Sequence, residues 1–489
     1  MIKKIKSFLF ENKTTRQTIA KNTFWLFLGE ISSRVLRGAI VIYAARVLGA
    51  DGWGVFSYAI TLAAFFTIFS DIGLSAILTR ESAKNPELRA RYLSTSFFLK
   101  LILMALSVLL IIFVAPLFTK ITAAKTLLPI VAMILVFDGL REFGFSLNRA
   151  LEQMESEAFT KTITNILIVV FGFLFLALSK TAKSLAWSYT LGSAIGFFIM
   201  VWTLRSYFKD VFSNFSKNLL WPIFSAAWPF ALLGFLGGIM INTDTIMLGW
   251  WRTAQEIGFY AVAQRVIQIL YVLPALLTTS VFPTFARLAF KDNEKFRKIL
   301  EKSIGISLLF GIPLIFGGLI IGENLIIALF GNEYLPAAIT FKILLTTIIL
   351  IFPAMFIGNA VFAYNQQKNF IGFVALGAIG NVVLNYLLIP RYGIEGSAIA
   401  TLGAQILSTG FVWIKMKKIN YFTIFPHLIK VFAAAIIMSL VVWIIKISGV
   451  NIFANIALSS IIYFGLLYIL KEPLLNELKL IFLGSKNNN

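Results

Sequence analysis

Residues 93–118, LSTSFFLKLILMALSVLLIIFVAPLF, decide the fold class of this chain. They contain one charged residue, Lys100, and are otherwise mostly apolar. A helix needs about 20 such residues to cross a hydrocarbon core of about 30 Å, so this segment is long enough to span a membrane. Similar segments fill the rest of the chain, which predicts an all-α integral membrane protein of about 14 transmembrane helices. The predicted spans lie near residues 22–45, 54–78, 93–118, 127–147, 162–179, 185–204, 222–250, 258–282, 303–322, 339–363, 370–389, 396–414, 428–446 and 452–470.

The composition agrees with a membrane protein of many spans. Hydrophobic residues make up 59% of the chain and charged residues 13%, whereas about 25% of residues are charged in soluble proteins. The connections are too short to fold alone, so backbone amides must be satisfied inside helices. The chain has no cysteine, which excludes disulfides, thiolate nucleophiles and Cys-ligated metal.

Lysine and arginine residues gather in alternate connections between the spans. Cations in short loops are retained on the cytoplasmic side of a membrane. With the N-terminus inside, the cytoplasmic segments take most of the 43 cations, so we expect a multi-pass protein of the inner, or cytoplasmic, cell membrane with both termini cytoplasmic. This distribution, with attraction to anionic membrane lipids, explains the net charge of +21, and no nucleic-acid partner is expected. The outer loops are predicted to contain Arg46, Lys120, Lys125, Lys180, Lys183, Arg252, Arg391 and Lys446.

Short motifs recur in the two halves of the chain. Gly54-Val55-Phe56 opens the second span and Gly258-Phe259-Tyr260 the eighth, while Glu152-Gln153-Met154 and Asn365-Gln366-Gln367 follow the fourth and tenth. We therefore predict two pseudo-symmetric six-helix lobes. Because six is even, the lobes should be related by an axis along the membrane normal, as in transporters that rock two lobes about a central site. The predicted parts are a basic cytoplasmic segment 1–21, an N-lobe 22–218, a C-lobe 219–420, and residues 421–489 with two extra C-terminal helices and a cytoplasmic tail.

The two extra helices, spans thirteen and fourteen, fall outside the repeat. Two roles are open for them. They are either simple anchors, or they form a groove against one lobe for a long hydrocarbon tail.

The first span contains three charged residues that share one helical face: Glu30, Arg34 four residues later, and Arg37 three residues after that. A charge in hydrocarbon costs roughly 2.5 to 3.5 kcal/mol on insertion scales, so such residues normally face a polar cavity or a partner. One interpretation is that Glu30 only neutralises Arg34. One carboxylate leaves the other guanidinium without a partner, however, which favours a cationic binding site.

Arg265 of the eighth span is a second buried cation, beside Gln264 and Gln268. If the lobes are duplicated, Arg34, Arg37 and Arg265 would converge on one cavity. Guanidinium groups match phosphate oxygens bidentately and stay charged, so this cavity suits a phosphate or pyrophosphate attached to a bulky group. For Arg265, a structural ion pair is the alternative.

Glu30 and several charged residues in other spans are candidates for coupling or gating. Asp244 of the seventh span either binds Arg265 or a coupling cation in turn, or forms a salt bridge near the interface. The remaining candidates are more typical of gate or packing pairs. They are Asp71 of the second span and the group Asp138, Arg141 and Glu142 of the fourth.

Several motifs together resemble the polysaccharide-export branch of the multidrug/oligosaccharidyl-lipid/polysaccharide (MOP) flippase superfamily. The likeness runs from residue 20 to about 420, and the order and spacing of the motifs are its most specific feature. They are Ala45-Arg46-Val47-Leu48-Gly49, Gly52-Trp53-Gly54-Val55-Phe56, Asp71-Ile72-Gly73-Leu74, Asp244 with Gly258-Phe259-Tyr260, Leu329-Phe330-Gly331, and Gly393-Ile394-Glu395-Gly396-Ser397-Ala398.

This resemblance implies a two-lobed exporter that turns a polyprenyl-pyrophosphate-linked oligosaccharide from the cytoplasmic to the outer leaflet by alternating access. Ser33-Arg34-Val35-Leu36 is similar to the first-span motif of the lipid II flippases, in which the arginine belongs to the substrate cavity. Arg37 departs from that motif, so its assignment rests on helical geometry. The implied partners are the lipid-linked oligosaccharide, membrane lipids and other polysaccharide-assembly proteins.

No enzymatic chemistry, cofactor or metal is expected. The chain lacks the Gly-x-x-x-x-Gly-Lys-Ser/Thr phosphate loop, so energy is expected from Na⁺ or H⁺ movement or from consumption of the product. Two other functions stay open. A cation-coupled multidrug or metabolite antiporter would share the fold, but the arginines of the first span favour an anionic substrate. A membrane glycosyltransferase or polymerase would need acidic or histidine clusters on large outer loops, whereas the single histidine, His427, lies at a cytoplasmic helix edge.

Overall fold

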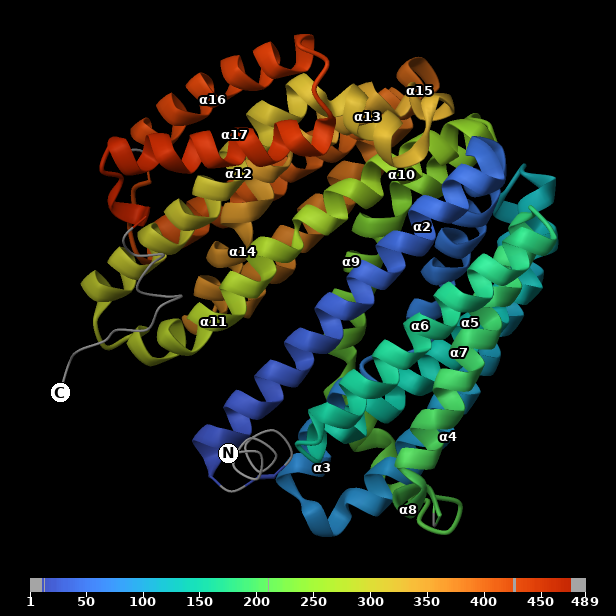
Figure 1. The fold of residues 1–489 in the computed structure, drawn as a ribbon. Helices are drawn as coiled ribbons and strands as arrows, with labels where there is room; N and C mark the ends of the chain where they lie inside the picture. Colours follow the sequence, from blue (N-terminus) through green and yellow to red (C-terminus); the bar gives the residue numbers. More distant parts are fainter. Residues whose placement is uncertain (1–10, 13, 210, 425–427, 476–489) are drawn as a thin grey trace. The chain divides into compact units, whose positions relative to one another are not determined.

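The computed structural model describes residues 11–12, 14–209, 211–424 and 428–475 (Figure 1). Within these ranges the regular structure is helical and contains no strand. The start of the basic segment 1–21, the end of the tail and His427 lie outside the described residues. The prediction of an all-α fold is therefore confirmed for the described part of the chain.

The first half of the chain forms eight of the α-helices and several short helical turns. The α-helices are α2 (Thr15–Thr67), α3 (Leu74–Lys84), α4 (Arg89–Leu109), α5 (Thr122–Ala150), α6 (Met154–Leu178), α7 (Ala182–Thr203), α8 (Arg205–Phe208) and α9 (Leu220–Trp251). The short turns are η1 (Ile68–Ser70), η2 (Pro86–Leu88), η3 (Leu110–Val114), η4 (Ala115–Phe118) and η5 (Lys217–Leu219).

The second half continues with helices of more varied length. They are α10 (Ala254–Leu270), α11 (Val272–Leu288), α12 (Asn293–Phe330), η6 (Asn332–Tyr334), α13 (Ala337–Thr346), α14 (Ile348–Ala363), α15 (Gln367–Ile419), α16 (Ile429–Ile447) and α17 (Ile452–Ile469).

Twelve helical segments of the described chain are long and apolar enough to cross a membrane. Two of them, α2 and α15, contain 53 residues each, which at 1.5 Å per residue is more than twice the hydrocarbon thickness. Each is interrupted by a glycine with positive φ, Gly49 at 67° and Gly393 at 59°. Both helices therefore supply two spans, and the predicted number of about 14 is confirmed.

Three predicted spans are broken in the structure. The span predicted at 54–78 ends at η1, and the chain turns through Asp71 and Gly73, whose φ is 91°, before α3 begins. The span at 258–282 is divided at Tyr271 into α10 and α11. The span at 339–363 is divided at Thr347 into α13 and α14. The Tyr271 and Thr347 hydroxyls lie 2.9 Å apart, so a hydrogen bond joins the last two breaks.

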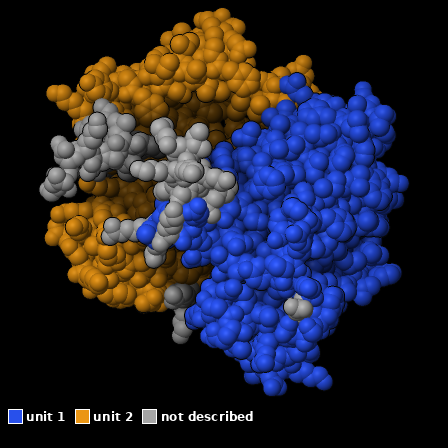
Figure 2. Space-filling view, turned by 60° about the horizontal axis from the view of Figure 1, so that its bottom comes forward, with its two compact units in different colours: residues 1–258 blue, residues 259–489 orange. Residues whose placement is uncertain are grey.

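Contacts within the chain define two compact units, residues 1–258 and residues 259–489, coloured separately in Figure 2. In the first unit α2 packs along α6, and α7 packs along α5 and α6. In the second unit an apolar core joins α11, α12, α14 and α15 to α16 and α17. Helix α9 belongs to the first unit by its contacts with α2 and α3. The lobe boundary near residue 219, which follows from the sequence repeat, stays a prediction.

The two motifs aligned as a repeat form the same turn. Glu152 and Asn365 both adopt left-handed backbone, with φ of 57° and 56°. The next amide in each turn bonds to the carbonyl five residues earlier: Gln153 N to Asn148 O at 2.9 Å, and Gln366 N to Val361 O at 3.0 Å. This pattern closes the end of a helix and sets the direction of the following one. The shared geometry supports the predicted duplication.

The other repeated motif places two glycines at a close helix crossing within residues 1–258. A Cβ at Gly54 would lie 1.7 Å from the carbonyl oxygen of Ala254, and a Cβ at Gly258 would lie 2.0 Å from that of Ala50. No side chain fits at such distances, so both positions require glycine. The second part of α2 and the start of α10 therefore approach each other at backbone distance.

Candidate functional site

The charged residues of the first span form one half of a polar cluster between α2 and α6. Glu30 Oε1 accepts a hydrogen bond from Arg34 Nε at 2.7 Å. Its other oxygen, Oε2, lies 2.6 Å from Lys161 Nζ on α6. The spacing of four residues brings Arg34 to Glu30 along the helix, whereas Lys161 reaches Glu30 because α6 packs along α2. A single carboxylate thus pairs with two cations.

Arg37 is held differently. Its Nε donates to Asn165 Oδ1 at 2.8 Å, and the Asn165 amide in turn donates to the Lys161 carbonyl at 2.7 Å and to Ser33 Oγ at 3.1 Å. Within the described residues Arg37 has no carboxylate partner. The cluster of Glu30, Arg34, Arg37 and Lys161, called here the cation cluster, therefore has three positive charges and one negative charge.

The cation cluster is not enclosed by its own unit. The side chain of Arg34 is 42% exposed and that of Lys161 is 30% exposed. Charged groups on a membrane helix face water or a polar ligand rather than acyl chains, because exposure to lipid is costly. This face of α2 therefore requires an aqueous or ligand-filled space beside it, and the unbalanced charge makes that space attractive to anions.

Asp71 and Lys100 form a separate ion pair inside the first unit. Lys100 Nζ lies 3.0 Å from Asp71 Oδ2, and the lysine side chain is almost fully buried. Asp71 also accepts from the amide and the hydroxyl of Ser75, at the point where the chain turns into α3. The pair joins α4 to this turn, which gives Lys100 the structural role expected of a buried cation with a partner.

The predicted group on α5 divides into two pairs. Arg141 is buried and its Nη2 lies 2.7 Å from Asp138 Oδ1, with its guanidinium 6.0 Å from the Phe145 ring centre. Glu142 instead pairs with Arg149 at 2.8 Å, and Arg149 also contacts Glu157 of α6. Both pairs lie within the first unit, and whether they serve as gate or packing pairs stays a prediction.

Asp244 and Arg265 belong to different units. Asp244 is buried in α9, beside Thr243 and Thr245. Arg265 is exposed on α10, where its Nη1 donates to Gln268 Oε1 at 3.2 Å. The convergence of Arg265 on Arg34 and Arg37, and the pairing of Asp244 with Arg265, stay predictions because each residue is described only within its own unit.

Two members of the site were missed by the sequence analysis. Lys161 lies directly before the predicted span 162–179, so it counts there as a cation of a cytoplasmic loop. In the structure α6 begins at Met154, which places Lys161 two turns inside the helix. The two residues missed are Lys161 and Asn165, and their spacing is the signal that could have found them. They are four residues apart, so on a helix they share one face.

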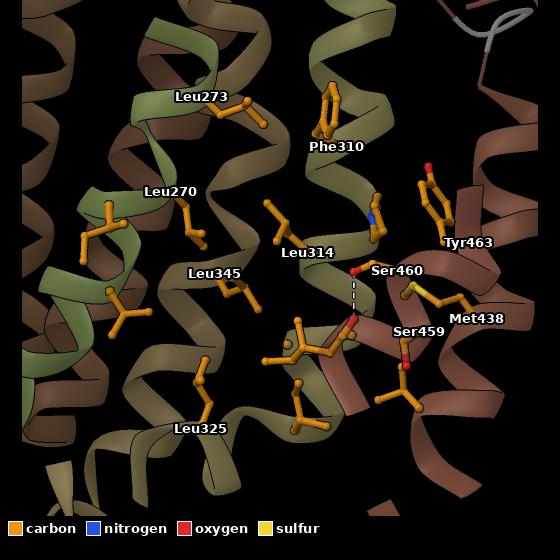
Figure 3. Close-up of a pocket in the computed structure, with 18 of the residues that line it drawn as sticks. Leu270, Leu273, Phe310, Leu314, Leu325, Leu345, Met438, Ser459, Ser460 and Tyr463 are labelled. Carbon is orange, nitrogen blue, oxygen red and sulfur yellow. Dashed lines mark hydrogen bonds between the residues drawn. The ribbon is translucent and has the colours of Figure 1, made fainter. Parts of the chain in front are cut away.

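A large apolar pocket lies within the second unit. Its volume is about 600 Å³, and it is lined by α10, α11, α12, α13, α16 and α17. Figure 3 shows Leu270 and Leu273 on one side, Phe310 and Leu314 on α12, and Met438 with Tyr463 on the other side. Spans thirteen and fourteen, which form α16 and α17, therefore pack against the core of this unit and complete the pocket.

The polar groups that line this pocket are already satisfied by the protein. Ser460 donates to the Ile456 carbonyl at 2.7 Å, drawn as a dashed line in Figure 3, and Tyr463 donates to the Leu309 carbonyl at 2.7 Å. Asn455 donates to the Val442 carbonyl and accepts from Ser459. A ligand in this pocket would meet an effectively apolar surface, and volumes of this size are typical of ligand sites.

The fold matches that of membrane transporters of the MOP superfamily. The lipid II flippase MurJ, in an inward closed conformation, aligns with a TM-score of 0.72 and 19% identity over 92% of this chain and 100% of its own. An inward-facing MATE-family multidrug resistance transporter of the MOP superfamily aligns with a TM-score of 0.62 and 14% identity over 80% of this chain and 94% of its own. At these identities the likeness establishes the fold.

Sequence comparison identifies the family. Residues 19–289 match the model of the polysaccharide biosynthesis protein family, which covers more than half of the chain, and the chain belongs to that family. The probable low-salt glycan biosynthesis flippase Agl15 of Haloferax volcanii is 25% identical over 391 residues, which is 78% of this chain and 80% of the relative. The predicted resemblance is confirmed at the level of the polysaccharide biosynthesis protein family, and the fold is the one seen in MOP-superfamily transporters.

Proposed function

We propose that this protein is a flippase for an oligosaccharide linked to a polyprenyl phosphate or pyrophosphate, acting in the assembly of a surface polysaccharide or glycoconjugate. The observation that carries this proposal is the cation cluster, in which Glu30 is the single carboxylate beside three cations: it pairs with Arg34 and Lys161, while Arg37 bonds to the neutral Asn165. The family and the naming of its relative Agl15 as a probable glycan flippase support the same substrate class.

The chemistry of the cluster suits a phosphate headgroup. Arginine presents planar, permanently charged donors that pair with two phosphate oxygens, and lysine adds a point charge. Neutral sugars need only hydrogen bonds, which hydroxyls such as Ser32 and Thr162, 2.9 Å apart beside the cluster, can supply. A small organic cation would be repelled by the net charge of the same site.

The lipid part of the substrate needs a different surface. The pocket between α12 and the α16–α17 pair is apolar, and its polar side chains are satisfied internally, so it suits part of a prenyl chain. This assignment favours the groove rather than the simple anchor as the role of spans thirteen and fourteen. A charged headgroup would find no unsatisfied donor there.

The mechanism that we infer is alternating access. The headgroup and sugars enter a polar cavity open to the cytoplasm, the prenyl chain stays in apolar surroundings, and the cavity then opens to the outer side. No covalent step is needed. A ligand drives such a change only by its different affinity for the two states, so the cation cluster must bind the headgroup more tightly in one of them.

We further propose that the protein lies in the cytoplasmic membrane with both termini on the cytoplasmic side, together with other polysaccharide-assembly proteins as partners. The distribution of cations along the chain supports the orientation. Energy from Na⁺ or H⁺ movement, or from consumption of the flipped product, is part of the same proposal.

Reconstitution into vesicles tests the proposed function. A fluorescent oligosaccharide on a polyprenyl diphosphate is placed in the vesicles, and its movement between leaflets is measured by quenching from outside. We expect movement with the wild type and a loss of at least about tenfold in Arg34→Ala, because a charge-assisted hydrogen bond contributes about 1.5–3 kcal/mol.

Arg80→Ala is the matched control. Arg80 pairs with Glu81 at 2.7 Å and its side chain is 44% exposed, compared with 2.7 Å and 42% for Arg34. The control should move substrate at the wild-type rate. Equal movement by wild type and Arg34→Ala would contradict the proposal, and transport of a small organic cation that persists in Arg34→Glu would favour the antiporter instead.

A further inference from the structure

The arrangement around Glu30 has a feature that substrate binding alone does not require. Both oxygens of this carboxylate are occupied, one by Arg34 and one by Lys161, at 2.7 and 2.6 Å. These are the same donors that a phosphate group would use. Glu30 therefore already occupies two donors that a phosphate group would use.

Arg37 differs from the other two cations because its described partner is neutral. Asn165 orients its guanidinium through Oδ1 and is itself fixed by the Lys161 carbonyl and Ser33. A neutral acceptor leaves the charge of Arg37 uncompensated. An arriving anion can therefore meet Arg37 without first breaking an ion pair.

We propose that Glu30 is an internal counter-anion that competes with the substrate's diphosphate for Arg34 and Lys161. The diphosphate binds first at Arg37 and then displaces the carboxylate from the other two cations. When the substrate leaves, Glu30 pairs with them again. This inference rests on the proposed function and adds a residue that sets how tightly the site holds its headgroup.

The competition has a functional reason. A site of three unopposed cations would hold a diphosphate so tightly that release would limit transport. A carboxylate on the same helix lowers the affinity because each binding event must break two ion pairs. It also lowers the barrier to release, since the cations regain a partner as the headgroup departs.

Equilibrium binding to the full-length protein tests this inference. Farnesyl diphosphate is titrated into the wild type and Glu30→Gln in detergent, and the dissociation constants are measured by calorimetry. Removing the competitor should tighten binding by about tenfold or more, since charge-assisted hydrogen bonds are stronger than neutral ones. In the vesicle assay the same variant should move substrate more slowly, because release is impaired.

Two further variants separate this effect from general electrostatics. Glu323→Gln removes a carboxylate that pairs with Lys342 in the second unit, and it should bind like the wild type. Glu30→Asp keeps the charge but is too short to reach both cations, so its affinity should lie between those of the wild type and Glu30→Gln. It also covers the case in which Glu30→Gln does not fold.

The outcomes are distinct. If the wild type binds farnesyl diphosphate and the Glu30 variants bind it more tightly, Glu30 acts as the counter-anion. If the wild type binds it and both Glu30 variants bind it equally or more weakly, the inference is overturned and the proposed function stands. Absence of binding in the wild type and in every variant overturns the proposed function, and the inference with it.

Discussion

Lys161 and Glu30 are 131 positions apart in the chain, and their charged atoms lie 2.6 Å from each other. The contact joins α6 to α2 and brings a third cation to the two arginines of the first span. It turns a pair of charges on one helix into a site built by two helices. Much of the proposed headgroup chemistry depends on this contact.

Replacing Lys161 should weaken headgroup binding without unfolding the protein. In Lys161→Met the carboxylate of Glu30 keeps Arg34 as its partner, so it is not left without a cation, but one phosphate donor is lost. We expect the dissociation constant for farnesyl diphosphate to rise by roughly tenfold, and Lys161→Arg to recover part of the loss. Calorimetric titration measures both, and a Lys161→Met variant that binds like wild type would exclude this lysine from the site.

Filling the apolar pocket should affect the lipid part of the substrate alone. The nearest atom to a Cβ at Gly317 is Met438 Cε at 3.6 Å, so a leucine there would project into the pocket without a backbone clash. We expect Gly317→Leu to slow movement of a long-chain substrate while its affinity for inorganic pyrophosphate stays unchanged. Gly465→Leu on α17 is the control, because Gly465 has open space around it and lies outside the pocket.

The Asp71–Lys100 pair should matter for stability rather than for transport chemistry. Lys100→Met leaves Asp71 without its cation in a mostly apolar surrounding, and we expect a loss of roughly 2–4 kcal/mol. The double variant with Asp71→Asn should regain part of it. Thermal unfolding in detergent measures the change, and Lys342→Met serves as comparison because its partner Glu323 is 46% exposed and such pairs contribute only about 0–1 kcal/mol.

The orientation in the membrane can be checked directly because the chain has no cysteine of its own. Lys180→Cys and Lys209→Cys each place one thiol at an exposed position, the first in a predicted outer loop and the second in a predicted cytoplasmic one. A membrane-impermeant maleimide applied to intact cells should label the first variant only. Labelling of Lys209→Cys before permeabilisation would reverse the assigned orientation.

The fold could be predicted because its main determinant is local. Long apolar segments form spans whatever their neighbours are. Each of the two helices interrupted at Gly49 and Gly393 supplies two spans, as the predicted number of spans requires. The breaks at Tyr271 and Thr347 were only partly predictable. Pro274 and Pro353 follow them closely and permit kinks in these spans, but the hydrogen bond that joins the breaks connects helices that are distant in sequence.

The site was partly predictable for the same reason. The spacing of Glu30, Arg34 and Arg37 places them on one face, and the structure keeps Glu30 with Arg34. Lys161 and Asn165 come from another helix, so their contribution depends on how α6 packs on α2. From its position in the sequence, Lys161 was interpreted only as a loop cation that marks the cytoplasmic side. In the structure its amine lies within the cation cluster.

The turns at Glu152 and Asn365 share their backbone geometry but differ in the side chains that attach to them. Each of these turns, called corners here, is specified by main-chain hydrogen bonds and one left-handed residue. The side chains around a corner can therefore make contacts of their own without changing the turn. The first corner receives the fully buried Lys21, which donates to the Glu152 carbonyl at 3.3 Å. At the second, Tyr364 instead bonds to Asn293 and Asn420. A variant in which the two turns are exchanged should keep both changes of chain direction, because the main-chain bonds are the same. It should lose the side-chain bonds that tie each turn to its neighbours, because these differ between the two turns.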